Sequence, residues 1–246
     1  MLYANVVDGV HRVEDAYTNW YLLEEDGRLT IVDTGVLSSW NSLAHVLPQI
    51  GRTTGDVEAV VLTHGHFDHL GFAERARRQL GVPVYVHAAD AELTRRPLSY
   101  ERERPRFYYF ATQRRALPIV ASLLRHRAFW PDPVQDVVTY RDGTLPVPGA
   151  PLIVPTPGHT NGHCALHLPD RDAVIAGDAI VTLDPYTGRT GPRAVARAAT
   201  ADSRRALAGL DGLARTGART VLVGHGDPWT GGAEDAVARA RQAGVA

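Results

Sequence analysis

Three histidines and an aspartate lie within six residues of this chain, in the run Thr63-His64-Gly65-His66-Phe67-Asp68-His69. The run follows residues 57–62, an apolar segment that predicts a buried strand. Imidazole and carboxylate are the usual protein ligands of zinc and related divalent ions. His64, His66 and Asp68 share one parity, which would turn them to one side of an extended loop, with His69 offset toward a second centre. The run therefore predicts a metal site at the end of a strand, where α/β proteins place their chemistry.

Three later segments have the same order of an apolar strand, a glycine and a side chain that binds metals. Those side chains are His159, Asp178 and His225, after strands expected at 151–154, 173–176 and 219–223. Glycine lets the backbone turn sharply beside a crowded site. Because each of the four segments runs from an apolar strand into side chains that bind metals, we expect these side chains to form one centre.

The order HxHxDH, then His, Asp and His, resembles that of the metallo-β-lactamase superfamily over nearly the whole chain. Residues 31–35, with the sequence IVDTG, are similar to an early strand and turn of that family. The resemblance implies an α/β fold, a four-layer αββα sandwich with its site at one edge between two sheets. It also implies two divalent metal ions, with zinc expected and iron or manganese as alternatives.

The same resemblance implies a role for each ligand. The first ion would bind His64, His66 and His159, the second would bind Asp68, His69 and His225, and Asp178 would bridge them. Asp33 would support the ligands by hydrogen bonding, or would merely shape its turn. Asp178 stands where true β-lactamases of the superfamily have cysteine or serine, so the chain is more similar to the glyoxalase II and lactonase branches.

Two ions roughly 3.5–4 Å apart can share a hydroxide, since metal binding lowers the pKa of water to about 7. We therefore expect a binuclear hydrolase that attacks the carbonyl of an ester, lactone or thioester, with Asp68 orienting the nucleophile or carrying its proton. Two other functions stay open. Persulfide dioxygenases have much of this pattern but bind a single iron, and a non-catalytic metal-binding protein would need the same ligands.

Residues 95–135 differ from the rest of the chain in their many arginines and aromatic residues. We expect a helical insertion that caps the core, roofs the active site, or does both. The side chains expected to line the substrate pocket are Phe107, Tyr108, Tyr109, Phe129, Trp130 and, from outside the insertion, Tyr186. Glu101 and Glu103 interleave with the arginines, which favours a solvated helix face over a nucleic-acid site.

The other elements follow from composition and turn signals. Strands are expected at 2–7, 10–14, 17–24, 28–33, 84–86, 136–140 and 163–168, and helices at 38–50 (with Ser38 as a possible cap), 70–80, 88–95, 193–215 and 232–243. We expect one domain over residues 1–246, because α/β chains of this length often form a single domain.

The composition limits the function classes. The net charge is −1 and all 26 basic residues are arginine. These features exclude Schiff-base lysine chemistry and give no bulk attraction to nucleic acid or to membranes. Cys164 is the single cysteine, so no internal disulfide can form. The first residues do not resemble a signal peptide, and no apolar run is long enough to span a membrane. We expect a cytoplasmic protein with a small-molecule substrate, and a homodimer is a possible assembly.

Overall fold

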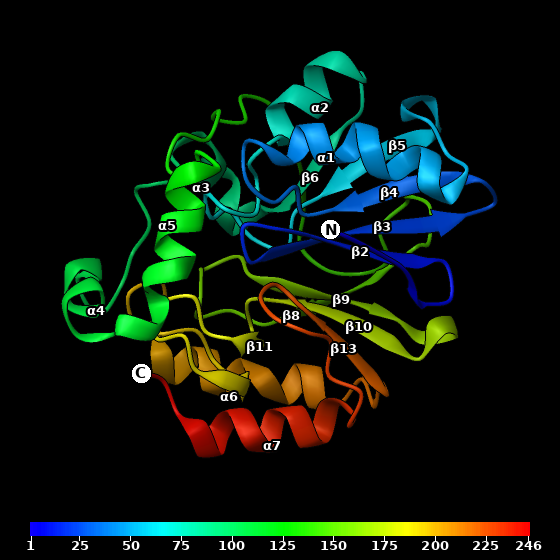
Figure 1. Cartoon of the computed structure of the whole chain (residues 1–246). Coiled ribbons are helices and arrows are strands. Elements are labelled where there is room, and N and C mark those ends of the chain that lie inside the picture. The colour runs from blue at the N-terminus through cyan, green and yellow to red at the C-terminus, as the bar shows by residue number, and fades with distance from the viewer.

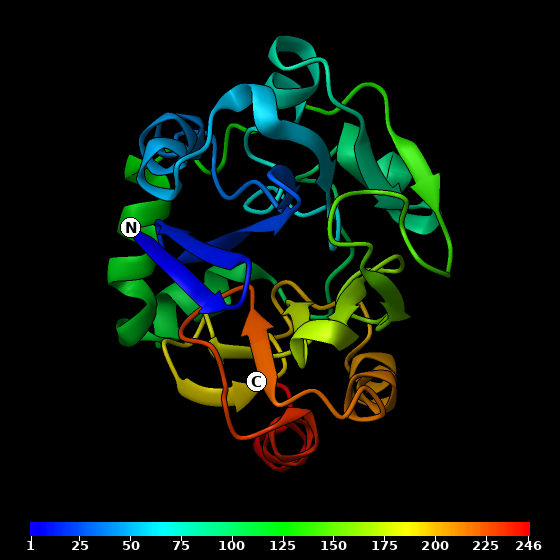
Figure 2. The same ribbon diagram turned by 90° about the vertical axis from the view of Figure 1, so that its right-hand side faces the viewer.

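Two β-sheets pack face to face in the computed structural model, which describes residues 1–246, and helices cover the outer face of each sheet (Figure 1). The larger sheet has the strand order β1-β2-β3-β4-β5-β6-β7, and the smaller one has the order β13-β10-β9-β8. After a 90° turn, two helices of the C-terminal half are seen nearly end-on below the smaller sheet (Figure 2). The architecture is the expected four-layer αββα sandwich.

The first half of the chain builds the larger sheet. Its strands are β1 (Leu2–Val7), β2 (Val10–Asp15), β3 (Thr18–Glu25), β4 (Arg28–Val32), β5 (Val57–Val61), β6 (Val84–His87) and, later in the chain, β7 (Val138–Tyr140). The first four strands pair antiparallel, and those from β4 to β7 pair parallel. The helices α1 (Ser39–Val46) and α2 (Ala73–Gln79) cover this sheet. Parallel pairing matters for the site, because it brings the ends of β4 and β5 to the same edge.

The second half builds the smaller sheet and its covering helices. The elements are β8 (Leu152–Pro155), β9 (Cys164–Leu168), β10 (Ala173–Gly177), β11 (Val181–Leu183), β12 (Thr190–Arg193), α6 (Ser203–Ala214), β13 (Thr220–Val223) and α7 (Ala233–Ala243). The strands β10 and β13 pair parallel, so their carboxyl ends also share one edge. Short 3₁₀ turns occupy Leu47–Ile50, Thr54–Asp56, Ala88–Asp90, Arg114–Ala116 and Pro169–Arg171.

The expected helix over 193–215 is wrong in its first part. Residues 190–193 pair with β11 as strand β12, and the helix begins only at Ser203. Asp202 sets that start as a helix cap, since its side chain accepts a hydrogen bond from the backbone N–H of Arg205 at 2.9 Å. The alanine-rich segment before it is buried around the insertion rather than along one helix face. Tertiary packing has overridden helix propensity there.

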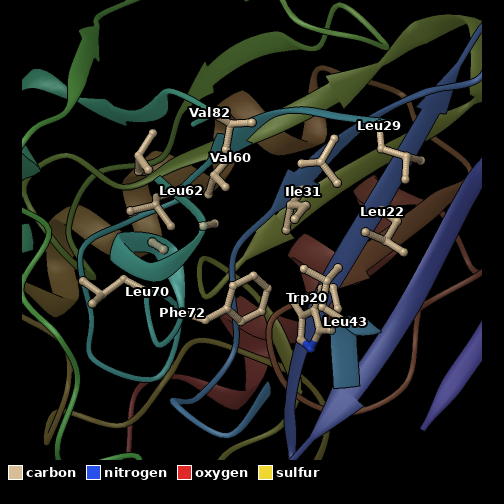
Figure 3. Packing of buried hydrophobic residues seen from close by; sticks show 14 of the residues in the cluster. Trp20, Leu22, Leu29, Ile31, Leu43, Val60, Leu62, Leu70, Phe72 and Val82 are labelled. Carbon is tan, nitrogen blue, oxygen red and sulfur yellow. The ribbon is translucent and has the colours of Figure 1, made fainter. Parts of the chain in front are cut away.

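The apolar core is divided into layers that follow the sandwich. One cluster lies between the first sheet and its helices, where Trp20 packs edge-on against Phe72 at 5.3 Å between ring centroids (Figure 3). A second cluster fills the space between the two sheets, and a third lies between the smaller sheet and α6 and α7. Because both faces of each sheet are covered, the strands are apolar on both sides, as in the run 57–62.

A fourth cluster belongs to the insertion, which stands at one margin of the sandwich (Figure 1). The insertion follows α3 (Ala91–Arg95) and contains α4 (Arg106–Thr112) and α5 (Leu117–Arg125), so the expected helical character is present. Ser38 does not cap the helix that follows it, because its hydroxyl bonds Nδ1 of His126 instead, at 2.9 Å. This contact ties the insertion to α1. None of the helices is long and apolar enough to cross a membrane.

Candidate metal centre

The polar side chains singled out in the sequence meet where parallel strands end. Asp33 follows β4 and His64 follows β5 in the larger sheet, while Asp178 follows β10 and His225 follows β13 in the smaller one. The sheets are joined beside the site, since the hydroxyl of Tyr21 donates to the carbonyl of Val223 at 2.6 Å. The loop between β8 and β9 adds His159. The carboxyl ends of two parallel pairs therefore face each other across the sandwich.

Two buried triads of metal-binding side chains result. One contains His64, His66 and His159, the other contains Asp68, His69 and His225, and within each the candidate ligand atoms lie within 4.8 Å of one another. Asp68 was expected on the same side of the loop as His64 and His66, and this prediction is wrong. Asp68 lies with His69 instead. The chain turns after His66, whose carbonyl accepts from the N–H groups of His69 and Leu70. The alternation of an extended strand does not apply to such a turn.

Asp178 lies between the two triads. Its Oδ2 is 3.4 Å from Nε2 of His159 on one side and 3.4 Å from Nε2 of His225 on the other. Its Oδ1 is 3.4 Å from Nε2 of His69. A carboxylate in this position can reach an ion in either triad, which is the geometry required of a bridging ligand.

The donor atoms themselves fit metal ions. Nε2 of His64, Nε2 of His66, both ring nitrogens of His159 and Oδ1 of Asp178 are buried without a hydrogen-bond partner. Buried polar atoms without partners are rare in folded proteins because each costs free energy. A cation bound at these lone pairs would remove that cost. The unpaired nitrogens and the all-His/Asp donor set therefore match zinc or a similar divalent ion.

Asp33 anchors two of the histidines from behind. Its carboxylate accepts hydrogen bonds from the backbone N–H and the hydroxyl of Thr63, both at 2.8 Å, and from Nδ1 of His69 at 2.9 Å. The proton of Thr63 is thus committed to Asp33, so the Thr63 oxygen accepts from Nδ1 of His64 at 3.0 Å. In both histidines Nε2 is left as the free lone pair. Asp33, His64 and His69 form a third group that is compact enough to hold a metal ion. The Asp33 carboxylate, however, already accepts these three hydrogen bonds.

Backbone and side-chain contacts fix two other histidines. Nδ1 of His225 donates to the carbonyl of Tyr17 at 2.7 Å, which leaves its Nε2 facing the centre. Both nitrogens of His163 are used, because Nε2 accepts the N–H of Asp178 at 3.0 Å and Nδ1 donates to Thr156 at 2.8 Å. His163 is thus a support for Asp178 and not a ligand.

Asp90 is a buried residue that the sequence did not single out. Its carboxylate accepts from the backbone N–H of Gly65 at 3.0 Å, from the hydroxyl of Thr160 at 2.6 Å and from the N–H of Gly162 at 2.6 Å. It therefore links the loop of the first histidines to the loop of His159. Burial raises its pKa, and the three donors act against that rise. A single polar residue inside the expected helix over 88–95 gives no signal of such a role.

Burial and charge set the protonation of the centre. Burial and neighbouring imidazoles hold the pKa values of His64 and His66 well below the ordinary value, and burial lowers the pKa of His159 to about 4. These imidazoles are neutral at neutral pH, which is the form that binds metal. Burial also opposes ionisation of Asp178, but the neighbouring rings of His225 and His69, when they are protonated, outweigh it and hold the pKa of Asp178 well below its usual range.

Gly224 shows how closely the chain segments approach. A Cβ at this position would lie 2.1 Å from Oδ1 of Asp178 and 2.9 Å from Cε1 of His69. Only glycine fits there, so the close approach of the strand end to Asp178 and His69 explains why a glycine precedes His225.

Four of the six aromatic residues expected to line the substrate pocket do not line it. Phe107, Tyr108 and Trp130 are exposed to solvent, with exposed fractions of 72%, 43% and 57%. Tyr109 is buried, but its hydroxyl donates to the carbonyl of Ala246. These four do not line the cavities beside the metal-binding residues, because they extend outward or pack toward the chain end.

Phe129 and Tyr186 do line a narrow apolar pocket that reaches the centre at Asp68. Its other walls are Phe67, Phe110, Val120, Leu123 and Pro185. A second, more polar cleft of about 230 Å³ reaches the centre at His159 and is bordered by Tyr100. The hydroxyls of Tyr100 and Tyr186 are 3.1 Å apart, and the Tyr100 ring lies 4.1 Å from that of His66. Tyr100 was missed from the sequence, because nothing near it in the chain marks it.

Known proteins are similar to this chain in sequence and in fold. A family model described as the Metallo-beta-lactamase superfamily matches residues 13–225. The chain is 29% identical to the probable metallo-hydrolase YflN of Bacillus subtilis (strain 168), over 91% of this chain and 86% of that protein. It is 31% identical to the uncharacterized protein Rv2581c of Mycobacterium tuberculosis, over 88% and 89%. The crystal structure of the metallo-beta-lactamase family protein TTHA1429 from Thermus thermophilus matches with a TM-score of 0.68 and 27% identity, over 97% of this chain and 81% of that one.

The chain belongs to the metallo-beta-lactamase superfamily, which agrees with the resemblance drawn from its motifs. It carries His and Asp groups that can hold metal ions, as expected for a metallo-hydrolase of that superfamily.

Proposed function

We propose that this protein is a binuclear metal-dependent hydrolase that cleaves an ester, a lactone or a thioester. The observation that carries the proposal is the position of Asp178, with its carboxylate 3.4 Å from histidines of both triads. A single-ion site would need only one triad, whereas here both are complete and both are buried. This favours two ions over the mononuclear iron centre of a dioxygenase. The presence of all ligands in both triads argues against a site that has lost part of its function.

Two bound ions would supply a hydroxide at neutral pH and would polarise the substrate carbonyl. The chain's own residues hold the reacting groups around that chemistry. Asp68 is 7% exposed, and its Oδ2 lies 3.5 Å from Nε2 of His225. It also faces the apolar pocket, so it can orient a water molecule and hold its proton beside an incoming carbonyl. Zinc is the ion we propose, because imidazole and carboxylate donors suit it.

Two cavities of different character border the centre, a cleft of about 230 Å³ and an apolar pocket of about 20 Å³. The pocket beside Asp68 has apolar walls, while the cleft beside His159 is bordered by the polar residues Glu92, Arg96 and Asn161. The hydroxyl pair of Tyr100 and Tyr186 joins the two cavities, since Tyr100 lines the cleft and Tyr186 lines the pocket. We therefore propose a substrate with a small apolar portion on one side of its scissile carbonyl and a polar portion on the other.

The experiment measures metal content and hydrolysis together. Protein loaded with zinc should hold two ions per chain and hydrolyse members of a panel of aryl esters, lactones and acyl thioesters. Asp178→Asn should lower the content toward one ion and reduce kcat/KM by at least about a hundredfold, since the bridge is lost. Asp170→Asn, at an exposed residue outside the triads, is the control and should change neither.

One iron per chain with oxygen uptake on a persulfide would overturn the proposal in favour of a dioxygenase. Two bound ions without turnover of any panel member would favour a non-catalytic metal-binding protein.

A further inference from the structure

The near-zero net charge of the chain conceals a strong separation of charge. Residues 95–135, called the insertion here, contain nine arginines and three acidic residues, which gives +6. The remainder contains 17 arginines and 24 acidic residues, which gives −7. Bulk charge gave no reason to expect an anionic partner, but the insertion alone is strongly basic. A local patch of one sign attracts the opposite charge whatever the total.

Exposed apolar side chains concentrate in the same segment. The chain has ten exposed large apolar residues, and seven of them lie in the insertion. They are Leu98, Phe107, Tyr108, Phe110, Leu117, Leu124 and Trp130. A concentration of this kind marks an interaction surface, whereas single exposed residues need no explanation.

The helix α5 is apolar on two sides. Ile119 and Leu123 face the protein and are buried, while Leu117 and Leu124 are each 50% exposed. Positions 117, 121 and 124 lie on one side of a helix, so Leu117, the exposed Ala121 and Leu124 form an outward apolar stripe. The neighbouring α4 adds Phe107, and both helices stand at the margin of the sandwich (Figure 1). This outward face has no partner within the chain.

Most arginines around this face are not neutralised. Arg95 and Arg96 pair with Glu92 at 3.5 and 3.6 Å. The others have no carboxylate oxygen within 4.0 Å, and they are Arg102, Arg104, Arg106, Arg114, Arg115, Arg125 and Arg127. Arg106 packs over the rings of Phe67 and Tyr100, while the charge of the other six is available to a partner outside the chain.

We propose that the insertion docks on an anionic phospholipid surface. Exposed Trp, Phe and Leu side chains flanked by arginine are the combination that enters the interface of a bilayer, with the arginines on anionic headgroups. A second copy of this chain fits less well, because a symmetric contact would set one +6 insertion against another. A nucleic acid would use the arginines but would leave Leu117 and Leu124 without a role.

Docking would also bring the lipid beside the helices that wall the apolar pocket. Phe110 of α4 and Val120 and Leu123 of α5 line the apolar pocket beside Asp68, on the elements that carry the outward face. An amphiphilic substrate could then enter from the bilayer surface. This consequence rests on the proposed function, but docking itself does not, so its test uses no activity.

The test is sedimentation of the zinc-loaded protein with two kinds of vesicle. One is phosphatidylcholine alone, and the other contains about 40 mol% phosphatidylglycerol, enough to give a strongly anionic surface. We expect binding to the anionic vesicles to be stronger by at least about tenfold and to be weakened by salt. Tryptophan fluorescence should shift to the blue on binding. Trp130→Phe should lose that shift while the protein still sediments.

Paired variants separate the contribution of the apolar side chains to vesicle binding from that of the arginines. Phe107→Ser with Leu124→Ser, and Arg114→Gln with Arg115→Gln, should each weaken binding by about tenfold or more. Leu152→Ser and the pair Arg215→Gln with Arg219→Gln remove residues of the same kinds elsewhere and should leave binding unchanged. Thermal unfolding and zinc content identify any variant that fails to fold.

Three results would overturn the proposal. One is absence of binding to anionic vesicles at low salt, and another is equal weakening by the remote control variants. The third is a dimer that the Phe107 and Leu124 variants convert to monomers without any vesicle binding, which would make the face a contact between copies. Tight binding of RNA or DNA through the same arginines, with no vesicle binding, would assign the face to nucleic acid instead.

Discussion

The carboxylate of Asp33 accepts a hydrogen bond from Nδ1 of His69 at 2.9 Å, on the side of the ring that faces away from the metal centre. Asp33 has a φ of 57°, in the left-handed region, although it is not glycine. Such a backbone conformation costs free energy in a non-glycine residue and persists only where the surroundings hold it. Three hydrogen bonds to the side chain supply that hold, and the residue in turn fixes which nitrogen of His69 is free.

The first prediction tests this support. Asp33→Asn retains a residue that tolerates positive φ, but its amide cannot accept from all three donors. We expect zinc affinity at the triad of Asp68, His69 and His225 to fall by about 10- to 100-fold. Competition with a chromophoric chelator measures it. Asp26→Asn is the matched control, since Asp26 has a φ of 49° in a hairpin turn away from the centre. Equal affinity in both variants would contradict a supporting role.

The second prediction concerns Asp90, which links two ligand loops. In Asp90→Asn the amide group must face at least one of the N–H groups of Gly65 and Gly162, so one buried donor loses its partner. We expect the free energy of unfolding to fall by about 1–3 kcal/mol in a urea titration. Asp56→Asn, in an exposed 3₁₀ turn, should cost less. A loss no larger than that of this control would show that the link does not stabilise the loops.

The third prediction uses the space at Gly224. In Gly224→Ala the new Cβ would lie 2.1 Å from Oδ1 of Asp178, so either the strand end or the bridging carboxylate must move. Zinc content and hydrolysis should fall together. Gly55→Ala is the control, because its Cβ would meet only the Thr53 hydroxyl, at 3.5 Å. Two ions and full activity in the Gly224 variant would be inconsistent with the site as described.

The fourth prediction follows from the single thiol. Cys164 is 1% exposed, and burial raises its pKa to about 12. At about pH 8 the thiolate, which is the reactive form, should be about one part in 10⁴ in the native protein. Ellman's reagent should therefore detect no thiol in native protein and one per chain after unfolding in guanidinium chloride. Fast labelling of the native protein at the same pH would mean that β9 opens readily.

Much of the metal centre could be anticipated from the chain. Each of the seven candidate ligands follows a strand or stands in a loop after one. Residue type with family order assigned six of them to two triads and Asp178 to the position between the triads. The predicted pocket was less accurate, since Phe107 and Trp130 are exposed. Aromatic composition identifies a segment with apolar surface, but it does not say whether that surface faces a cavity or solvent.

The sequence alone determined the donor chemistry, because His and Asp at these positions have few other roles as a set. It also determined the strands of the two packed sheets, although not β11 and β12, because an apolar run on both faces of a sheet has a recognisable composition. Only the tertiary structure decided how those donors are oriented. Asp90, Tyr100 and Asp33 act across long separations in the chain, as in the contact between Tyr100 and Tyr186. Such contacts depend on which strand ends face each other across the two sheets, and local sequence patterns do not contain that information.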